Sequence, residues 1–519
     1  MRIAFIYTEI DRWALGIRSV SAFLKRAGHT TRLILTGPSE DLCSEQALRE
    51  IKDLVKDADV IALSCFSRGS DKATQIADYL RPLGKFTLWG GMHATLNPEE
   101  CAKSVDVVCR GEGEGMMLEL LDRLALGKEW RDIANGVFQK DGTVAMNPLR
   151  PLIEDLDTLP LPDYTFVDEH HLTDKGFARI TNISDVTEPI MFIGSRGCYY
   201  HCTYCSNTKM KEIFAGTGKY VRKMSIDRYI EQARALRASF PKSTYYYFID
   251  EDFFARPLEE LRRFSDKYSK EIGMPFDVLA SPLQTTPEKM DLLVKAGLWR
   301  VRMGVESGSE RTKKEVYNRH MSNESVKRAA EAINKYPQVV PFYFVIISNP
   351  YEEKEDLADT IRFLAELPSP YFMQAFNLVF FPGSALYDRA VKDGLIQGRE
   401  DSGYRLDYRG GLRYKGHDWK GKNLYLNGLL YLMEGRSAPS RLGLLPRRIV
   451  PYLISENVVR FNERHPAAIK LMISLKMLTL LFRKRGARVL TKVIRDPKFI
   501  YNLKMALNGA GKKRRASAA

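Results

Sequence analysis

Residues 198–205 read Cys-Tyr-Tyr-His-Cys-Thr-Tyr-Cys, so that Cys198, Cys202 and Cys205 follow the spacing C-x3-C-x2-C. Three thiolates this close together suit a soft metal centre. A structural zinc site takes four ligands, and no further cysteine follows Cys205. An iron–sulfur cubane normally takes four cysteines, so three leave one iron open to a small molecule. The octapeptide therefore predicts an iron–sulfur centre with an open coordination position.

The octapeptide follows the first of six short apolar runs, which are separated from one another by stretches with helical spacing. Alternating strands and helices are typical of a parallel sheet that closes partly or fully into a barrel. In such barrels the functional residues lie at the carboxyl ends of the strands. The predicted strands cover residues 189–194, 244–250, 276–280, 300–305, 341–347 and 376–380.

The first 130 residues show the same alternation of strand and helix. Ile17, Val20 and Leu24 recur at helical spacing between the first two apolar runs, and Gly28 ends that helix. The pattern predicts a flavodoxin-like or Rossmann-like open parallel sheet with helices on both faces. The predicted strands cover residues 3–7, 29–35, 60–64, 86–89 and 105–109.

A hairpin at 137–144, with Asp141-Gly142 at its centre, and a proline-rich stretch separate the two regions. Beyond about residue 400 the sequence becomes irregular and then helical and basic. We therefore predict an α/β protein of four segments. They are a sheet domain (1–135), a hairpin and linker (136–184), a partial six-stranded barrel (185–398) and a basic, mainly helical C-terminal region (399–519).

The barrel region resembles the radical S-adenosylmethionine (SAM) enzymes, whose hallmark is this cysteine spacing with an aromatic residue, here Tyr204, before the last cysteine. The resemblance implies that the cysteines hold a [4Fe–4S] cluster whose open iron binds SAM and cleaves it reductively. It also implies that the acidic turn after the second strand holds the SAM amino group, and that Glu306 holds the ribose. The residues implied for SAM are Tyr204, Asp250, Asp252, Gly304, Glu306 and Ser307.

The N-terminal sheet is similar to cobalamin-binding domains, in which the loop after the first strand reads D-x-H-x-x-G and its histidine ligates cobalt. Here Trp13 replaces that histidine, and indole is not a metal ligand. The resemblance therefore implies base-off cobalamin with no lower ligand from the protein and a bulky ring near that face. The alternative is a flavodoxin-like sheet whose cofactor site has decayed. The residues implied for cobalamin are Asp11, Trp13, Gly16, Ser64, Gly90 and Gly91.

Positive charge is concentrated at the C-terminus. The formal net charge is +15, and residues 436–519 carry 20 basic and three acidic residues, so the rest of the chain sums to −2. Three roles compete for this region: a helical cap on the barrel, docking on an anionic membrane, and nucleic-acid binding through phosphates. We favour a cap with peripheral membrane association over nucleic acid, because aromatic residues are few and no RNA-module signature is present.

The start of the sequence does not resemble a signal peptide, and seven cysteines in a long chain do not suggest a disulfide framework. Residues 467–482 form the most apolar stretch, but a membrane span needs about 20 apolar residues, and this stretch contains Lys470 and Lys476. We therefore expect a cytoplasmic protein.

Together the two resemblances imply a cobalamin-dependent radical SAM enzyme that methylates an unactivated carbon, or phosphorus, of a small-molecule or lipid-like substrate. Such an enzyme takes electrons from an external donor of the flavodoxin or ferredoxin type. The alternatives are an oxidative cyclase or rearrangement enzyme with the same cofactors, a tRNA methylthiotransferase, and a non-enzymatic cofactor-carrying scaffold. A methylthiotransferase needs three further cysteines for a second cluster; the remaining four, Cys43, Cys65, Cys101 and Cys109, are scattered and favour core packing instead.

Overall fold

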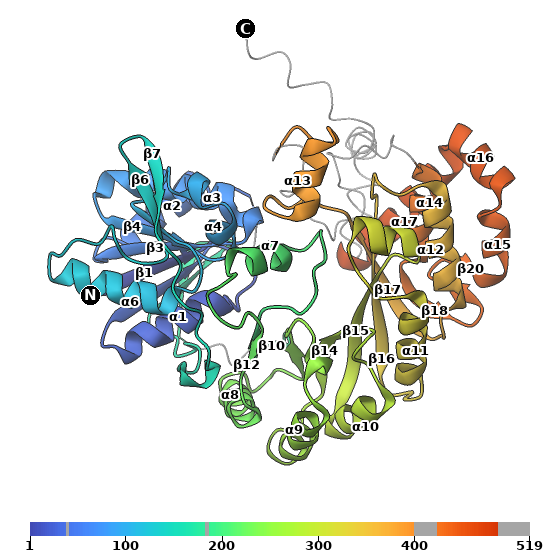
Figure 1. Cartoon of the computed structure of the whole chain (residues 1–519), viewed down its shortest axis with the longest axis horizontal. Helices are drawn as coiled ribbons and strands as arrows, with labels where there is room; N and C mark the ends of the chain where they lie inside the picture. The colour runs from blue at the N-terminus through green and yellow to red at the C-terminus, as the bar shows by residue number, and fades with distance from the viewer. Residues whose placement is uncertain (38–40, 182–185, 399–422, 486–519) are drawn as a thin grey trace, which may run out of the picture.

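The computed structural model describes residues 1–37, 41–181, 186–398 and 423–485, with side chains up to Lys476. Two large sheets organise this part of the chain. Figure 1 shows them next to each other, the N-terminal sheet in blue and the barrel sheet in green and yellow, with the helices of the C-terminal region beyond the barrel. The α/β fold class is confirmed.

The first sheet has the strand order β7-β6-β5-β4-β3-β1-β2-β8-β9. Its central strands β1 to β5 are parallel, as predicted, and apolar residues fill both sides of it. Helices α1 and α6 pack together, as do α2 and α3. The bounds are β1 (Arg2–Tyr7), β2 (Thr30–Leu35), β3 (Val60–Ser64), β4 (Phe86–Gly90), β5 (Val107–Cys109), α1 (Leu15–Arg26), α2 (Glu45–Leu54), α3 (Ser70–Leu80), α4 (Met92–Leu96), α5 (Pro98–Cys101) and α6 (Gly113–Ala125).

The segment predicted as hairpin and linker contributes to this sheet at both edges. The predicted hairpin forms as β6 (Gly136–Lys140) and β7 (Thr143–Met146) beside β5. A second hairpin, β8 (Glu169–Thr173) and β9 (Gly176–Ile180), pairs with β2 at the opposite edge. A buried ion pair of 2.7 Å between Arg18 and Glu169 fixes that hairpin to α1. The sequence pattern did not predict β8 and β9.

The second sheet begins with six parallel strands in the order β10-β13-β14-β15-β16-β17, which confirms the partial barrel. The prediction for the last strand was wrong: β17 starts five residues and ends three residues earlier than predicted, because the apolar run continues past its end. The bounds are β10 (Ile190–Phe192), β13 (Tyr246–Phe248), β14 (Phe276–Ala280), β15 (Leu298–Glu306), β16 (Val340–Ile347), β17 (Tyr371–Asn377), α8 (Ile226–Ser239), α9 (Leu258–Glu271), α10 (Pro287–Ala296), α11 (Asn323–Asn334), α12 (Lys354–Glu366) and α13 (Ala385–Lys392).

The C-terminal region covers the far end of the barrel sheet. Three short antiparallel strands extend the sheet beyond β17, and α14 packs against α12, α16 and α17. Within the described ranges, no helix combines the length and apolarity that a bilayer crossing requires. The basic residues beyond 485 lie outside the described residues. The bounds are α14 (Leu424–Met433), β18 (Gly435–Ala438), β19 (Arg441–Leu442), β20 (Leu445–Pro446), α15 (Val450–Leu453), α16 (Glu456–Arg464) and α17 (Ala467–Arg485).

Candidate active site

The three cysteines of the octapeptide lie on the loop between β11 (Ser195–Arg196) and α7 (Ser206–Ile213). Cys205 is the N-cap residue of α7, and the Thr208 hydroxyl donates to the carbonyl of Cys202 at 2.8 Å, which folds the loop onto the first helical turn. Cys202 is buried, Cys198 and Cys205 are half-buried, and none of the three forms a disulfide. The predicted ligands therefore share one short, ordered loop.

Three cysteine thiols on one short loop are a donor set that fits an iron–sulfur cubane. Among the residues that the structure describes, no three His, Cys, Asp or Glu side chains converge as ligands of one ion. A cubane binds each thiolate through a different iron atom, so its ligands need not converge. Burial raises the pKa of Cys198 to about 11 and that of Cys205 to about 12, so binding the cluster must displace thiol protons.

The structure brings Tyr204, Gly304 and Glu306 together beside this loop. Glu306 ends β15 with φ of 64°, and the Tyr204 side chain hydrogen-bonds to its carboxylate. A Cβ at Gly304 would lie 2.1 Å from Glu306 Oε1, so a larger residue there would displace this carboxylate from its position. Burial raises the pKa of Glu306, although Arg319 and Tyr204 oppose the shift. The predicted ribose-binding carboxylate thus lies at the end of a barrel strand, next to the cysteine loop.

Arg319 joins the same group and was not predicted. Its Nη1 donates to Cys202 Sγ at 3.5 Å, and its Nη2 donates to the carbonyl of Gly304 at 2.7 Å. No sequence pattern indicates it, because Arg319 lies 117 residues after Cys202 and outside any recognised spacing. This cation lies beside a predicted cluster ligand.

The acidic turn after β13 divides into three different environments. Asp250 is 2% exposed; its Oδ2 accepts from Gly194 N at 3.3 Å and from the Tyr229 hydroxyl at 3.1 Å, whereas its buried Oδ1 has no hydrogen-bond partner among the described residues. Asp252 accepts from the Tyr200 hydroxyl at 2.9 Å and thereby ties the cysteine loop to the turn.

Glu251, between these two aspartates, is the exposed member of the turn. Its carboxylate accepts from the Asn207 amide at 2.9 Å, and its charge acts on the thiols of both Cys198 and Cys205. Ser307, predicted for SAM, is fully buried and instead donates to Glu352 at 3.1 Å. Ser307 is thus paired within the protein, and its assignment to SAM stays a prediction.

The predicted cobalamin residues Ser64, Gly90 and Gly91 meet at the carboxyl edge of the first sheet. Ser64 ends β3 in register with Tyr7 on one side and Gly90 on the other. Gly91 has φ of 90°, and a Cβ there would lie 2.7 Å from Ser64 Oγ. A Cβ at Gly90 would meet nothing closer than 3.6 Å. Of the two glycines, only Gly91 is required by the backbone and its neighbours.

The loop after β1 is held by Asp11, whose carboxylate accepts from Trp13 N at 2.9 Å and the Tyr7 hydroxyl at 2.7 Å. Trp13 is only 4% exposed, and its ring packs against Tyr164 and Phe240, with ring centroids 6.3 and 4.9 Å away. This placement gives the indole a packing role in the core shared with the barrel and lends no support to the expectation that it flanks the corrin. Gly16 is exposed and has open space around it.

Glu9, which was not predicted, lies just after β1 at this edge. It is 5% exposed and accepts from Phe66 N at 2.7 Å. Burial raises its pKa to about 7, against the opposing hydrogen bond from Phe66. A buried carboxyl that titrates near neutrality is a frequent feature of functional sites.

The four cysteines outside the loop are buried in the first domain, where Cys43, Cys65 and Cys101 belong to one apolar core and Cys109 to the other. Burial raises the pKa of Cys43 and raises that of Cys109 to about 12. These thiols are core residues in this structure.

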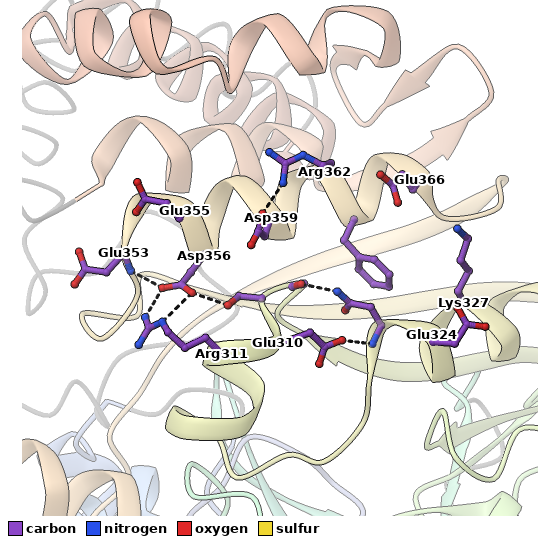
Figure 2. Close-up of a pocket in the computed structure, with 14 residues that line it drawn as sticks. Glu310, Arg311, Glu324, Lys327, Glu353, Glu355, Asp356, Asp359, Arg362 and Glu366 are labelled. Atoms are coloured by element: carbon purple, nitrogen blue, oxygen red, sulfur yellow. Dashed lines mark hydrogen bonds and ion pairs between the residues drawn. The ribbon is translucent and has the colours of Figure 1, made fainter.

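A cavity of about 650 Å³ lies between α11 and α12, away from the cysteines. Figure 2 shows its charged lining, with Arg311 paired to Asp356 and Arg362 paired to Asp359. Gly308 and Ser309, which follow Glu306, reach its wall, but no residue of the cysteine loop lines it. This cavity is therefore separate from the site described above.

Two family models match the chain. The B12 binding domain matches residues 2–121, and the Radical SAM superfamily matches residues 192–364, so together they cover more than half of the sequence. The first match contains the Ser64–Gly91 edge, and the second contains the cysteine loop, Glu306 and Arg319.

Three curated relatives illustrate the family. An uncharacterized methyltransferase, PH0819, of Pyrococcus horikoshii is 27% identical over 393 residues, 74% of this chain and 79% of that protein. A cytidylyl-2-hydroxyethylphosphonate methyltransferase of Streptomyces wedmorensis is 23% identical over 79% of this chain and 84% of that protein. An anaerobic magnesium-protoporphyrin IX monomethyl ester cyclase of Rubrivivax gelatinosus is 23% identical over 70% of this chain and 65% of that protein.

The fold is also found in a solved structure. The radical SAM methyltransferase TsrM of Kitasatospora setae, with cobalamin and a [4Fe–4S] cluster bound, matches 76% of this chain and 78% of its own, with a TM-score of 0.61 and 13% identity. The chain therefore belongs to the radical SAM enzymes that carry an N-terminal B12-binding domain, and its cofactors are a [4Fe–4S] cluster, SAM and cobalamin.

Proposed function

We propose that the protein transfers a methyl group from SAM, by way of cobalamin, to an unactivated carbon or to phosphorus of a small-molecule or lipid-like substrate. One observation carries this proposal: the two cofactor-binding regions touch. Helix α7, which begins after Cys205, packs against α4, which begins after Gly91. Ser206 Oγ donates to Met92 Sδ at 3.4 Å across this contact. Chemistry that needs both cofactors together requires such proximity.

When bound, the cluster and cobalamin supply the one-electron cleavage of SAM and the carriage of its methyl group. The residues of this chain bind and orient the substrates for those steps. Glu306 and Tyr204 form a carboxylate–hydroxyl pair suited to the ribose diol. Two carboxylates suit the SAM ammonium: Glu251, which is exposed and whose charge acts on two of the cysteines, and Asp250, whose buried Oδ1 has no partner among the described residues.

At the first sheet, we assign the nucleotide tail of cobalamin to the edge formed by Ser64 and Gly91, where backbone approaches without an intervening side chain. The hydrogen bond from Tyr200 to Asp252 joins the cysteine loop to the carboxyl end of the barrel strands, where the substrate would enter. A closed, dry mouth protects radical chemistry from water and stray hydrogen donors.

The competing function is oxidative cyclisation or rearrangement, favoured by the similarity to the Rubrivivax cyclase. Anaerobically reconstituted protein incubated with SAM, a reductant and candidate substrates separates the two. Methyl transfer through cobalamin releases both S-adenosylhomocysteine and 5′-deoxyadenosine, whereas cyclisation releases only 5′-deoxyadenosine. A scaffold releases neither, and absence of S-adenosylhomocysteine contradicts the proposal.

For partners, we propose an external electron donor of the flavodoxin or ferredoxin type and peripheral contact with an anionic membrane surface on the cytoplasmic side. The membrane proposal is supported by α17, in which Leu471, Met472 and Leu475 share one face and are 61%, 44% and 53% exposed. The opposite face, with Ile469 and Ile473, is buried against α14. A second apolar face left in water beside basic residues suits a lipid surface.

A further inference from the structure

A largely buried ion network joins the N-terminal domain to the strand that precedes the cysteines. Arg196, in β11, donates to Glu112 Oε1 and to Glu114 Oε1, at 2.6 Å in each case. Arg222, its partner across the pairing of β11 with β12 (Arg222–Lys223), donates to Glu112 Oε1 at 2.9 Å. The side chains of Glu114 and Arg222 are 3% and 4% exposed. Those of Arg196 and Glu112 are 27% and 15% exposed, so the network joins the two domains with two members buried and two in partial contact with solvent.

The two carboxylates are anchored on their own side of the network without help from Arg196. Both lie at the start of α6, which follows β5 of the first sheet. Glu112 Oε2 accepts from Ile153 N at 2.8 Å, and Glu114 Oε1 also accepts from Ser19 Oγ at 2.9 Å. The carboxylates therefore form a fixed acceptor pair that Arg196 joins from the barrel side.

The network adjoins the cysteine loop in sequence and connects to the cobalamin edge through the pairing of β5 with β4. Arg196 lies two residues before Cys198, and β5 pairs in parallel with β4, whose carboxyl end carries Gly91. At the far end of α7, Phe214 packs over Gly111, in the turn that holds the two carboxylates. The cysteine loop is therefore attached to the first domain both before Cys198 and after Cys205.

We propose that Arg196 is a positioning residue that sets the spacing between the cysteine loop and the cobalamin edge of the first sheet. This inference rests on the two-cofactor reaction proposed above and adds the element that holds the two regions in register. Its planar guanidinium binds two carboxylates at once, which a lysine ammonium cannot reproduce in the same geometry. Transfer between two bound groups falls steeply when they are displaced by about 1 Å.

The test compares Arg196→Gln and Arg196→Lys with the control Arg150→Gln. The control breaks an ion pair of 2.6 Å with Glu119 that involves no barrel residue and whose side chains are each 33% exposed. In Arg196→Gln we expect faster amide hydrogen exchange in residues 110–116 and 195–199, unchanged iron and corrinoid content, and a loss of S-adenosylhomocysteine formation on the order of 100-fold. Arg196→Lys should fall between wild type and Arg196→Gln, and the control should match wild type.

Exchange rates and product yields of Arg196→Gln equal to those of wild type would overturn the inference. Loss of bound iron would also overturn it, because Arg196 would then support the cysteine loop itself rather than the distance between that loop and the cobalamin edge. If Arg196→Gln fails to fold, Arg196→Lys decides the question by the same measurements. If wild type forms no S-adenosylhomocysteine, the proposed function fails, while the exchange measurement still tests the network.

Discussion

Arg319 donates a hydrogen bond to Cys202 Sγ at 3.5 Å while its second nitrogen donates to the carbonyl of Gly304 at 2.7 Å. One cation thus links the cysteine loop to the end of β15, next to Glu306. A positive charge at this place stabilises negative charge on a cysteine ligand, and reduction adds negative charge to an iron–sulfur cluster. The reduction potential of the cluster should therefore depend on Arg319.

Replacing Arg319 with Gln should lower the reduction potential of the cluster by on the order of 60 mV, the equivalent of about 1.4 kcal/mol for one electron. Arg319→Lys keeps the charge and should retain most of the wild-type potential. Redox titration followed by electron paramagnetic resonance measures the shift. Equal potentials in the Gln variant and wild type would show that the cation does not act on the cluster.

The two adjacent glycines after β4 should respond differently to alanine. Gly91→Ala forces a Cβ to within 2.7 Å of Ser64 Oγ at a φ of 90°, which should cost about 1–3 kcal/mol of stability and weaken corrinoid binding. Gly90→Ala meets nothing closer than 3.6 Å and serves as the control. Urea unfolding and titration with hydroxocobalamin measure the two effects. Equal stability and equal corrinoid affinity in the two variants would contradict the assignment of Gly91 to the cobalamin site.

Glu352 should make stability depend on pH. Burial raises its pKa from 4.5 to about 8, against a hydrogen bond from Ser307. Between those two values Glu352 is ionised in the unfolded chain but protonated in the folded chain. The free energy of unfolding therefore falls as pH rises from 4.5 towards 8. Glu352→Gln does not titrate, and its stability relative to wild type should therefore increase over this range by a few kcal/mol, since each pKa unit corresponds to about 1.4 kcal/mol.

Urea unfolding of wild type and Glu352→Gln at pH 5, 6, 7 and 8 gives that difference directly. A difference that stays constant across the series would mean that Glu352 is ionised in the folded protein.

The exposed face of α17 should govern binding to lipid. The triple variant Leu471→Ser, Met472→Ser and Leu475→Ser should sediment less with anionic vesicles than wild type does, because about 25 cal/mol is lost for each Å² of apolar area that no longer enters the lipid. Leu126→Ser, at a leucine 67% exposed in the first domain, is the matched control. Binding to neutral vesicles should be weak for all three proteins. Equal sedimentation of wild type and the triple variant would exclude this face as a membrane contact.

Local sequence patterns predicted much of the architecture. Short apolar runs located β1 to β4 and most barrel strands, because a strand buried on both faces is apolar throughout. The cysteine spacing located the cofactor loop because all three predicted ligands lie within eight consecutive residues. The last barrel strand was misplaced because the apolar run at 376–380 continues beyond it, whereas β17 itself alternates buried and exposed positions.

What the sequence did not predict depends on contacts between distant segments. The β8–β9 hairpin joins the first sheet through the buried pair of Arg18 with Glu169, which are 151 residues apart. Arg319 and Glu9 acquire their environments only when separate loops meet. The assignments of Asp250 and Ser307 to SAM stay predictions: Asp250 accepts from Tyr229 through Oδ2 while its Oδ1 has no partner among the described residues, and Ser307 donates to Glu352.

The iron content of anaerobically purified protein tests the central claim most directly. Wild type should hold about four iron atoms per chain, and Cys202→Ala should be folded and free of iron. About eight iron atoms in wild type would indicate the second cluster of a methylthiotransferase. A folded wild-type protein without iron would contradict the assignment of Cys198, Cys202 and Cys205 as cluster ligands, and with it the proposed reaction.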